Sequence, residues 1–273
     1  MAVITIVRDL GSLGEEIAKE LGRITGYRIL DKGYIEPLLA GYGFKPELQE
    51  KLDEKRPGFW ASLSEDRSDY IHYVKTALFE EAVKGDCIVV GRGGTAVFKN
   101  VPSRLAVRIT APLELRLRRA VDLCLCDEKH ARLVVEQSDH DRGGFNKIFF
   151  GLDWNDLCAF DLAISTARMD AVQAAETIDR LRRLVVDEER EAAGRTKLAD
   201  MALGQRVVTS IVYQSKVRLQ SLEAAADGGS VTLYGLANTQ HALDRAAAAA
   251  AAVPGVSEVK NEIQLAQEFS IYP

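Results

Sequence analysis

Residues 8–14 form a short turn whose composition suits the binding of a phosphate group. The segment reads RDLGSLG, follows a β-branched apolar run at residues 2–7, and precedes a stretch with apolar residues at helical spacing. A glycine turn between a buried strand and a helix presents backbone N–H groups and the positive end of the helix dipole to an anion. The same pattern also occurs in turns that only connect a strand to a helix. Either a phosphate site or a purely structural turn is therefore expected here.

The turn lacks the lysine of the usual phosphate-binding loop. That loop reads G-x-x-x-x-G-K-[ST], in which the lysine reaches the outer phosphates and the hydroxyl holds magnesium. When Gly14 is placed at the lysine position, the turn contains no lysine. A phosphate bound here would need another cation.

Strands and helices alternate along the first two thirds of the chain. Short apolar runs predict strands, and amphipathic stretches such as residues 171–186 predict helices between them. Mostly apolar strands separated by helices are typical of a parallel sheet covered on both faces. We therefore predict an α/β domain whose strands include residues 2–7, 87–90, 105–109 and 160–165.

A second, smaller unit follows. Residues 187–204 carry alternating charges in place of apolar periodicity, which predicts a solvated helix end and a linker. Beyond them come a strand at 230–234, a helix containing the seven consecutive alanines 246–252, and an alternating strand at 256–265. The predicted organisation is an α/β domain over 1–186, a charged linker over 187–204 and a small α+β module over 205–267.

The composition excludes several classes of protein. Of 273 residues, 47% are hydrophobic and 27% charged, and the formal net charge of −5 lacks the positive excess of a non-specific nucleic-acid binder. No run approaches the roughly 18 apolar residues of a membrane span, and the N-terminus lacks the basic start of a signal peptide. The four cysteines show no paired C-x-x-C spacing. We expect a cytoplasmic protein with reduced cysteines and no nucleic-acid partner.

Four segments, in order, resemble the cytidylate kinase-like family, a branch of the nucleoside monophosphate kinases. They are ITIVRDLGSLGEEIAKELG at 4–22, YRILDKG at 27–33, VVGRGGTAVF at 89–98 and FNKIFFGLDWNDLCAFDLAIST at 145–166. The opening of that family also lacks the lysine and has an arginine at the position of Arg8. The resemblance implies a three-layer P-loop kinase-like core with a five-stranded parallel sheet and a mobile lid. It also implies ATP and Mg²⁺ as cofactors and a CMP-like nucleoside monophosphate as acceptor.

The resemblance assigns roles to residues of the turn. Gly11, Ser12 and Gly14 would supply N–H groups that face the phosphates. Arg8 would replace the missing lysine by spreading a planar charge over phosphate oxygens. The alternative for Arg8 is a surface ion pair with Asp9.

On the acceptor side, the resemblance points to Asp31 and Arg92. Asp31 matches the family's aspartate after the second strand, and Arg92 matches the arginine that pairs with the phosphate of the acceptor. The alternative for Asp31 is to cap a helix that begins near Gly33.

A lid is expected around residues 137–147, which read QSDHDRGGFNK. The glycine pair at 143 and 144 would make this segment flexible. Arg142 and Lys147 would then neutralise charge on the transferred phosphoryl group, and Arg132 would bind the nucleotide. The alternative is an ordinary solvated loop.

Three residues depart from the family pattern. Leu13 replaces a glycine, Glu15 replaces an arginine beside the phosphates, and Gly93 replaces the acceptor-binding aspartate of true cytidylate kinases. We expect that Leu13 cannot take the positive φ that a glycine permits, and that Glu15 repels a triphosphate unless magnesium bridges the two. A catalytically degraded nucleotide-binding or structural scaffold is therefore the alternative to an active kinase.

The C-terminal module is similar to the BON domain. Its segments VTLYG at 231–235 and VPGVSEVKN at 253–261 match the hallmark sequences of that family. The resemblance implies a small ligand-binding or phospholipid-binding unit. With five basic and six acidic residues from 204 onward, the module offers little attraction to anionic lipid. We expect it to sense an unknown ligand or to assemble the chain into a homo-oligomer.

Overall fold

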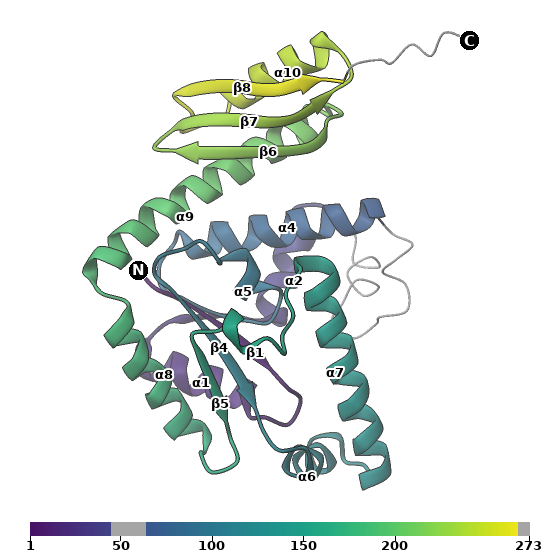
Figure 1. Ribbon diagram of the computed structural model, residues 1–273, viewed down its shortest axis with the longest axis vertical. Coiled ribbons are helices and arrows are strands. Elements are labelled where there is room, and N and C mark those ends of the chain that lie inside the picture. The colour runs from purple at the N-terminus through teal and green to yellow at the C-terminus, as the bar shows by residue number, and fades with distance from the viewer. Residues whose placement is uncertain (45–63, 267–273) are drawn as a thin grey trace. The chain divides into compact units, whose positions relative to one another are not determined.

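The computed structural model describes residues 1–44 and 64–266, which form two compact units that divide between Arg195 and Thr196. Unit 1 contains a five-stranded parallel sheet in the order β2-β3-β1-β4-β5 (Figure 1). Its strands are β1 Val3–Arg8, β2 Arg28–Leu30, β3 Cys87–Val90, β4 Arg104–Thr110 and β5 Leu162–Ser165.

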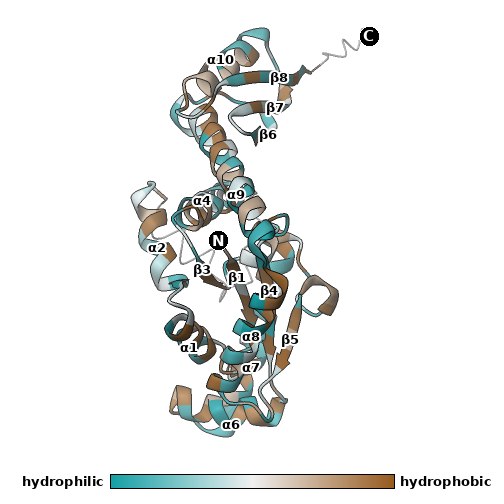
Figure 2. Cartoon of the chain, turned by 90° about the vertical axis from the view of Figure 1, so that its left-hand side faces the viewer, coloured by the Kyte–Doolittle hydropathy of each residue, from teal (hydrophilic) through white to brown (hydrophobic). Residues whose placement is uncertain are grey.

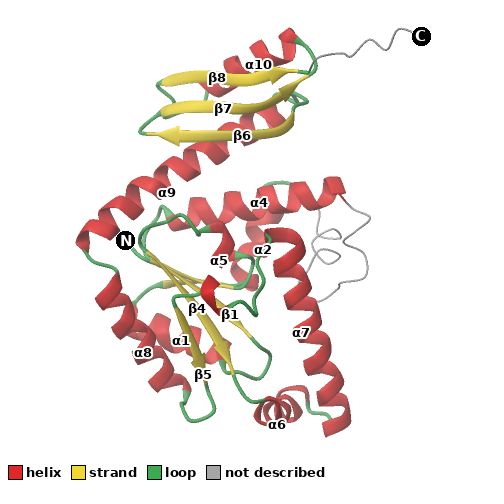
Figure 3. Cartoon of the chain, in the orientation of Figure 1, coloured by secondary structure: helices red, strands yellow, loops and turns green. Residues whose placement is uncertain are grey.

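Helices connect these strands and cover the sheet. In unit 1 they are α1 Gly14–Thr25, α2 Lys32–Gly41, α4 Ser64–Ala82, α5 Gly94–Val97, α6 Leu113–Cys124, α7 Glu128–Phe150 and α8 Ala171–Val185, with a short 3-10 helix at Leu157–Ala159 (Figure 3). α1 and α8 contact each other and cover one face of the sheet, whereas α5 packs against β1 from the other face. This is the three-layer arrangement predicted from the alternation of strands and helices.

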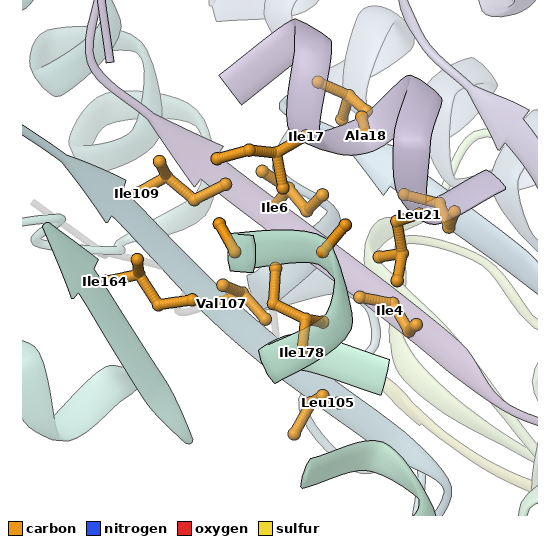
Figure 4. Close-up of a cluster of buried hydrophobic side chains, with 14 residues drawn as sticks. Ile4, Ile6, Ile17, Ala18, Leu21, Leu105, Val107, Ile109, Ile164 and Ile178 are labelled. Atoms are coloured by element: carbon orange, nitrogen blue, oxygen red, sulfur yellow. The ribbon is translucent and has the colours of Figure 1, made fainter. Parts of the chain in front are cut away.

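β1 lies at the centre of the sheet because its sequence, VITIVR, can be buried on both faces. Ile4 and Ile6 point toward α1 and α8 and pack with Ile17 and Ile178 (Figure 4). Thr5 points the opposite way and shares a 2.9 Å hydrogen bond with Thr95 of α5. β1 and β3 are accordingly mostly hydrophobic (Figure 2). Because all five strands are parallel, their carboxyl ends meet at one edge, where sites in such folds are built.

Unit 2 contains a separate three-stranded sheet in the order β6-β7-β8. β6 Gln220–Asp227 runs antiparallel to β7 Ser230–Ala237, and β7 runs parallel to β8 Glu258–Leu265. The connection from β7 to β8 is helix α10, Gln240–Ala251, which packs against the sheet. Ala246 and Ala250 are fully buried, so the alanine run lets this helix approach the sheet closely.

The stretch 187–204, predicted as a charged linker, is helical. It lies within α9, Glu188–Val208, which a π-helical turn, Thr209–Gln214, extends. Three glutamates in its first turn interact favourably with the helix dipole, and its lysines, arginines and alanines are good helix formers. Charge alternation therefore marks a helix here, whose charged side chains are mostly exposed. None of the helices within residues 1–44 and 64–266 is long and apolar enough to cross a membrane.

His72 makes the stability of unit 1 depend on pH. It lies in α4 and is 8% exposed, and burial, with a smaller effect of the Lys75 charge, lowers its pKa from 6.5 to about 4. Below pH 6.5 the unfolded chain gains a proton that the folded chain does not bind, so stability falls as the pH drops toward 4. The loss is expected to reach about 2 kcal/mol between pH 6.5 and pH 5.

Urea denaturation across this pH range checks the prediction. His72→Phe should flatten the pH dependence of the free energy of unfolding. If the free energy of unfolding falls equally with pH in wild type and in His72→Phe, the pH dependence does not come from His72.

Candidate functional site

The turn between β1 and α1 lies at the carboxyl edge of the sheet and offers backbone amides to a ligand. β1 ends at Arg8 and α1 begins at Gly14. Leu13, at the N-cap of α1, makes no side-chain hydrogen bond to the amides of the first helical turn. Those amides therefore keep their hydrogen-bonding capacity and the positive end of the dipole remains uncompensated by a cap.

Side chains from other segments of the chain donate hydrogen bonds to the backbone carbonyls of the turn. Arg116 Nε donates to Leu10 O at 2.8 Å, Arg119 Nη1 donates to Gly11 O at 3.0 Å, and Arg142 Nη1 donates to Arg8 O at 3.1 Å. Thr166 Oγ1 donates to Ser12 O at 3.1 Å. With several carbonyls held by side chains of other segments, the turn is rigid before a ligand arrives, and ligand binding requires less ordering of the backbone.

Two glycines of the turn are required by close contacts. Gly11 has φ +77, and a Cβ there would lie 2.7 Å from the carbonyl oxygen of Arg116. A Cβ on Gly14 would lie 2.5 Å from the Cβ and Cγ of Arg8, so the Arg8 side chain packs directly on Gly14. Ser12 differs from the prediction in orientation: its Oγ donates to Asp9 O at 2.8 Å and its N–H donates to the same oxygen at 3.4 Å. The serine thus closes the turn internally.

Leu13 adopts the conformation that was expected to be closed to it. Its φ is 65° and its ψ is 23°, in the left-handed region. The expectation was wrong because the surroundings compensate the cost of the left-handed conformation, which is roughly 1–2 kcal/mol for a residue other than glycine. The Leu13 side chain packs against the core cluster that contains Ile17, and its carbonyl accepts the Ile17 N–H at 2.9 Å. Leucine at this position therefore keeps the backbone in a shape that glycine would also adopt.

Arg8 extends over the turn and pairs with Glu15. Its Nε lies 3.0 Å from Glu15 Oε1, and its side chain is only 12% exposed. The alternative partner, Asp9, is buried and engaged elsewhere: Arg108 Nη2 donates to Asp9 Oδ1 at 2.5 Å and Thr110 Oγ1 donates to Oδ2 at 2.6 Å. Arg8 thus lies where it could meet a phosphate, and a carboxylate currently accepts its hydrogen bond.

Sequence reasoning missed three arginines that build the site. Arg108 is a charged residue inside the otherwise apolar run of β4, and its burial signals a buried partner, here Asp9. Arg116 and Arg119 lie three residues apart on α6, so one face of the helix brings both to the turn. Arg116 also pairs with Asp139 of α7 at 2.9 and 2.5 Å. Burial lowers the pKa of Arg119, whose guanidinium also donates to Thr166 Oγ1 at 2.8 Å.

The predicted flexible lid is part of a continuous helix. α7 runs through both glycines of the pair at 143 and 144. The expectation failed because Gly143 has a packing role: a Cβ there would lie 3.0 Å from Trp154 Nε1. Of the three predicted cations of this region, the structure brings Arg142 to the turn, where it is buried. Lys147 is exposed five residues further along, on another face of the helix.

Arg132 lies away from the turn. It is ten residues before Arg142 on the same helix, which separates the two by about 15 Å along the axis. Its guanidinium is 42% exposed and lies 3.8 Å from Glu114 of α6. The described contacts therefore do not connect Arg132 with the amides of the turn.

Asp31 and Arg92 follow β2 and β3 at the same edge of the sheet. Asp31 caps α2, because its Oδ1 accepts the N–H of Tyr34 at 2.9 Å. This is the capping alternative that the sequence left open. Arg92 is buried, with φ 53°, and donates to Tyr70 Oη at 2.9 Å and to Glu36 Oε1 at 3.4 Å.

Gly93 leaves no room for a larger side chain, such as the aspartate that the resemblance implies at this position. Its φ is +68, and a Cβ would lie 2.3–2.5 Å from three carbons of the Phe150 ring. Phe150 therefore packs directly on the backbone at Gly93. The edge of the sheet at Gly93 is therefore more apolar than the resemblance implies.

The donors near the turn fit a magnesium ion that a nucleotide brings with it. Within residues 1–44 and 64–266, no three His, Cys, Asp or Glu side chains cluster as a metal site. Mg²⁺ in phosphate-transfer sites needs only one or two carboxylates besides phosphate oxygens and water. Glu15 provides an exposed carboxylate in the first turn of α1. The donor set is therefore compatible with a metal held mainly by the phosphates.

Comparison with known proteins identifies both units. Residues 3–168 match the model of the cytidylate kinase-like family. The chain belongs to the cytidylate kinase-like family. Residues 199–267 of this kinase-like chain match the BON domain model. Both predicted resemblances are therefore confirmed, and so is the fold class, a parallel α/β P-loop kinase-like core with a small α+β module.

Relatives of the kinase-like domain include two proteins named cytidylate kinase. One, from Methanocella arvoryzae, is 26% identical over 192 residues, which cover 70% of this chain and 99% of the relative. The other, from Pyrobaculum aerophilum, is 27% identical over 179 residues, which cover 64% of this chain and 89% of the relative. A solved structure of an uncharacterized protein from Eubacterium ventriosum shares the fold, with a TM-score of 0.51, 20% identity, and coverage of 67% of this chain and 98% of that one.

Proposed function

We propose that the kinase-like domain transfers the γ-phosphoryl group of ATP to a nucleoside monophosphate, CMP or a similar small acceptor. One observation carries the proposal: a rigid turn at the N-terminus of α1, whose amides lack a side-chain cap and whose carbonyls are held by three arginines. Phosphoryl transfer depends mainly on positioning and on stabilising negative charge. A preformed set of N–H donors and cations is suited to both tasks.

The residues of the turn divide this work. The amides of Gly11, Gly14 and the first helical turn would bind phosphate oxygens. The guanidinium of Arg8 would leave Glu15 and reach the phosphates, where a planar bidentate donor suits the oxygens. Arg142 would position Arg8 through its 3.1 Å hydrogen bond to the Arg8 carbonyl. Bound Mg²⁺ would neutralise charge that develops on the phosphates.

On the acceptor side, we propose that Arg92 binds the acceptor and that Asp31 shapes its pocket by capping α2. Arg92 is already fixed by Tyr70 and Glu36, so its guanidinium is oriented before the acceptor binds. Arg132, which is partly buried, and Lys147, which is exposed, both lie on α7 and would act only if α7 moved toward the nucleotide. The packing of Phe150 on Gly93 supports a second candidate, phosphorylation of an acceptor other than a nucleotide.

We propose that the BON module regulates the kinase-like domain or assembles it into a homo-oligomer, with a ligand still to be found.

The four cysteines are free, which suits the reducing cytoplasm. The scaffold alternative rests on the Arg8–Glu15 pair, because an arginine neutralised by a carboxylate is less available to ATP.

Product analysis by mass spectrometry distinguishes these candidates. The full chain is incubated with Mg²⁺, ATP and each of the common nucleoside monophosphates. Formation of CDP from CMP is the expected result. ATP binding without any phosphorylated nucleotide would contradict the kinase proposal. In that case, a phosphorylated product from a sugar or hydroxy-acid panel would support the second acceptor class, and its absence would support the scaffold.

A further inference from the structure

Glu15 occupies a specific place in the phosphate-binding pattern. With Gly14 at the lysine position of G-x-x-x-x-G-K-[ST], Glu15 stands at the position of the hydroxyl residue that normally holds magnesium. Its carboxylate is 48% exposed and lies 3.0 Å from Arg8 Nε, above the turn. The side chain therefore combines the position of a metal ligand with access to solvent.

A carboxylate at this position creates an electrostatic problem for nucleotide binding. Two like charges a few ångströms apart repel each other strongly at the effective dielectric constant of a protein surface. In the resting structure Arg8 balances Glu15. If Arg8 turns to the phosphates, Glu15 loses that partner beside a highly charged anion. A second cation would restore the balance of charge.

We propose that Glu15 is a direct ligand of the Mg²⁺ that accompanies ATP, in place of the hydroxyl of the usual loop; this inference rests on the proposed function. Carboxylate and phosphate oxygens are the ligands that Mg²⁺ prefers at such sites. The Arg8–Glu15 contact is then replaced by two new contacts: the guanidinium binds phosphate and the carboxylate binds metal. The resting ion pair keeps both side chains over the turn until the metal–nucleotide complex arrives.

Other carboxylates near the turn are less suited to this role. Asp9 is buried and accepts hydrogen bonds from Arg108 and Thr110. Asp139 accepts two hydrogen bonds from Arg116. Glu16 is exposed, but it lies about 100° further round α1 and its charge acts on Arg119. Glu16 therefore provides a matched control of equal charge and adjacent position.

Calorimetric titration of the full chain with ATP, once with Mg²⁺ and once with a chelator, tests the proposal. Wild type and Glu16→Gln are expected to bind ATP at least 10-fold more tightly with Mg²⁺. Glu15→Gln should lose most of that gain and should bind metal-free ATP several-fold more tightly than wild type, since the repulsion between Glu15 and the phosphates is gone. Mn²⁺ in place of Mg²⁺ gives a spectroscopic readout: Glu15→Gln should weaken Mn²⁺ binding to the protein–ATP complex.

The outcomes separate the role of Glu15 from the proposed function. An undiminished Mg²⁺ gain in Glu15→Gln would overturn the metal-ligand role while leaving nucleotide binding intact. Equal losses with and without Mg²⁺ would overturn it too, because they would mean that Glu15 only positions Arg8. Failure of wild type to bind ATP under either condition would instead contradict the proposed function on which the inference rests.

Discussion

Arg8→Ala is expected to lower the rate of ATP-dependent phosphoryl transfer by about 10³-fold, the lower end of the effect of a phosphate-binding arginine in such reactions. The turn contains no lysine, and Arg116, Arg119 and Arg142 donate to its backbone carbonyls. Arg8, with its side chain over Gly14, is therefore placed to supply the charge that the lysine usually supplies. Its removal should leave negative charge on the phosphates uncompensated.

Single-turnover kinetics and ATP calorimetry measure this effect. Arg8→Lys should recover part of the rate, because it restores the charge without the planar fork. Arg23→Ala serves as the control: Arg23 lies near the end of α1, 69% exposed, and pairs there with Glu20. Arg8→Ala with a rate close to that of Arg23→Ala would contradict the role assigned to Arg8.

Asp9→Ala is expected to destabilise unit 1 by about 3–5 kcal/mol, because it would leave a buried arginine without its partner. The side chains of Asp9 and Arg108 are 5% and 8% exposed, and their 2.5 Å contact connects the turn with β4. Asp9 also accepts from Thr110 Oγ1 and lies 3.8 Å from Arg116. The carboxylate thus joins the turn to two segments about a hundred residues away.

Urea denaturation followed by tryptophan fluorescence checks this value, because the Arg108 guanidinium lies 4.5 Å from the centre of the buried Trp154 ring. Asp9→Asn keeps an acceptor for Thr110 and should cost less than Asp9→Ala. Glu20→Ala removes an exposed ion pair on α1 and should leave the unfolding midpoint close to that of wild type. A midpoint for Asp9→Ala that matches Glu20→Ala would contradict the account of this buried pair.

Local patterns were sufficient to predict much of the core. β1, β3 and β4 are strands buried on both faces, so their continuous apolar runs were visible in the sequence. β2 has only three residues at the edge of the sheet, too few to give a period of its own. The polar stretch around Gly143 indicated a loop, but contact with Trp154 keeps the glycines inside α7. Tertiary packing overrode the local propensity there.

The site was predictable only where its residues are neighbours in the sequence. Gly11, Gly14 and Arg8 belong to one short segment, whose pattern predicted either an anion site or a purely structural turn. The bonds that hold this segment join residues 99 to 154 positions apart, as in Arg108–Asp9 and Thr166–Ser12. No local pattern pairs such residues. Leu13 shows the same limit, because its strained φ is tolerated by packing that the sequence does not reveal.

The most direct test of the central claim, that the amides ahead of α1 and Arg8 bind the phosphates of ATP, is a crystal structure of the full chain with Mg²⁺ and a non-hydrolysable ATP analogue. We predict that the β-phosphate lies within hydrogen-bonding distance of the N–H groups of Gly14 and Glu15, with the Arg8 guanidinium on a phosphate oxygen and away from the Glu15 carboxylate. A nucleotide bound elsewhere, or a turn that stays empty at saturating analogue with the Arg8–Glu15 pair intact, would contradict it.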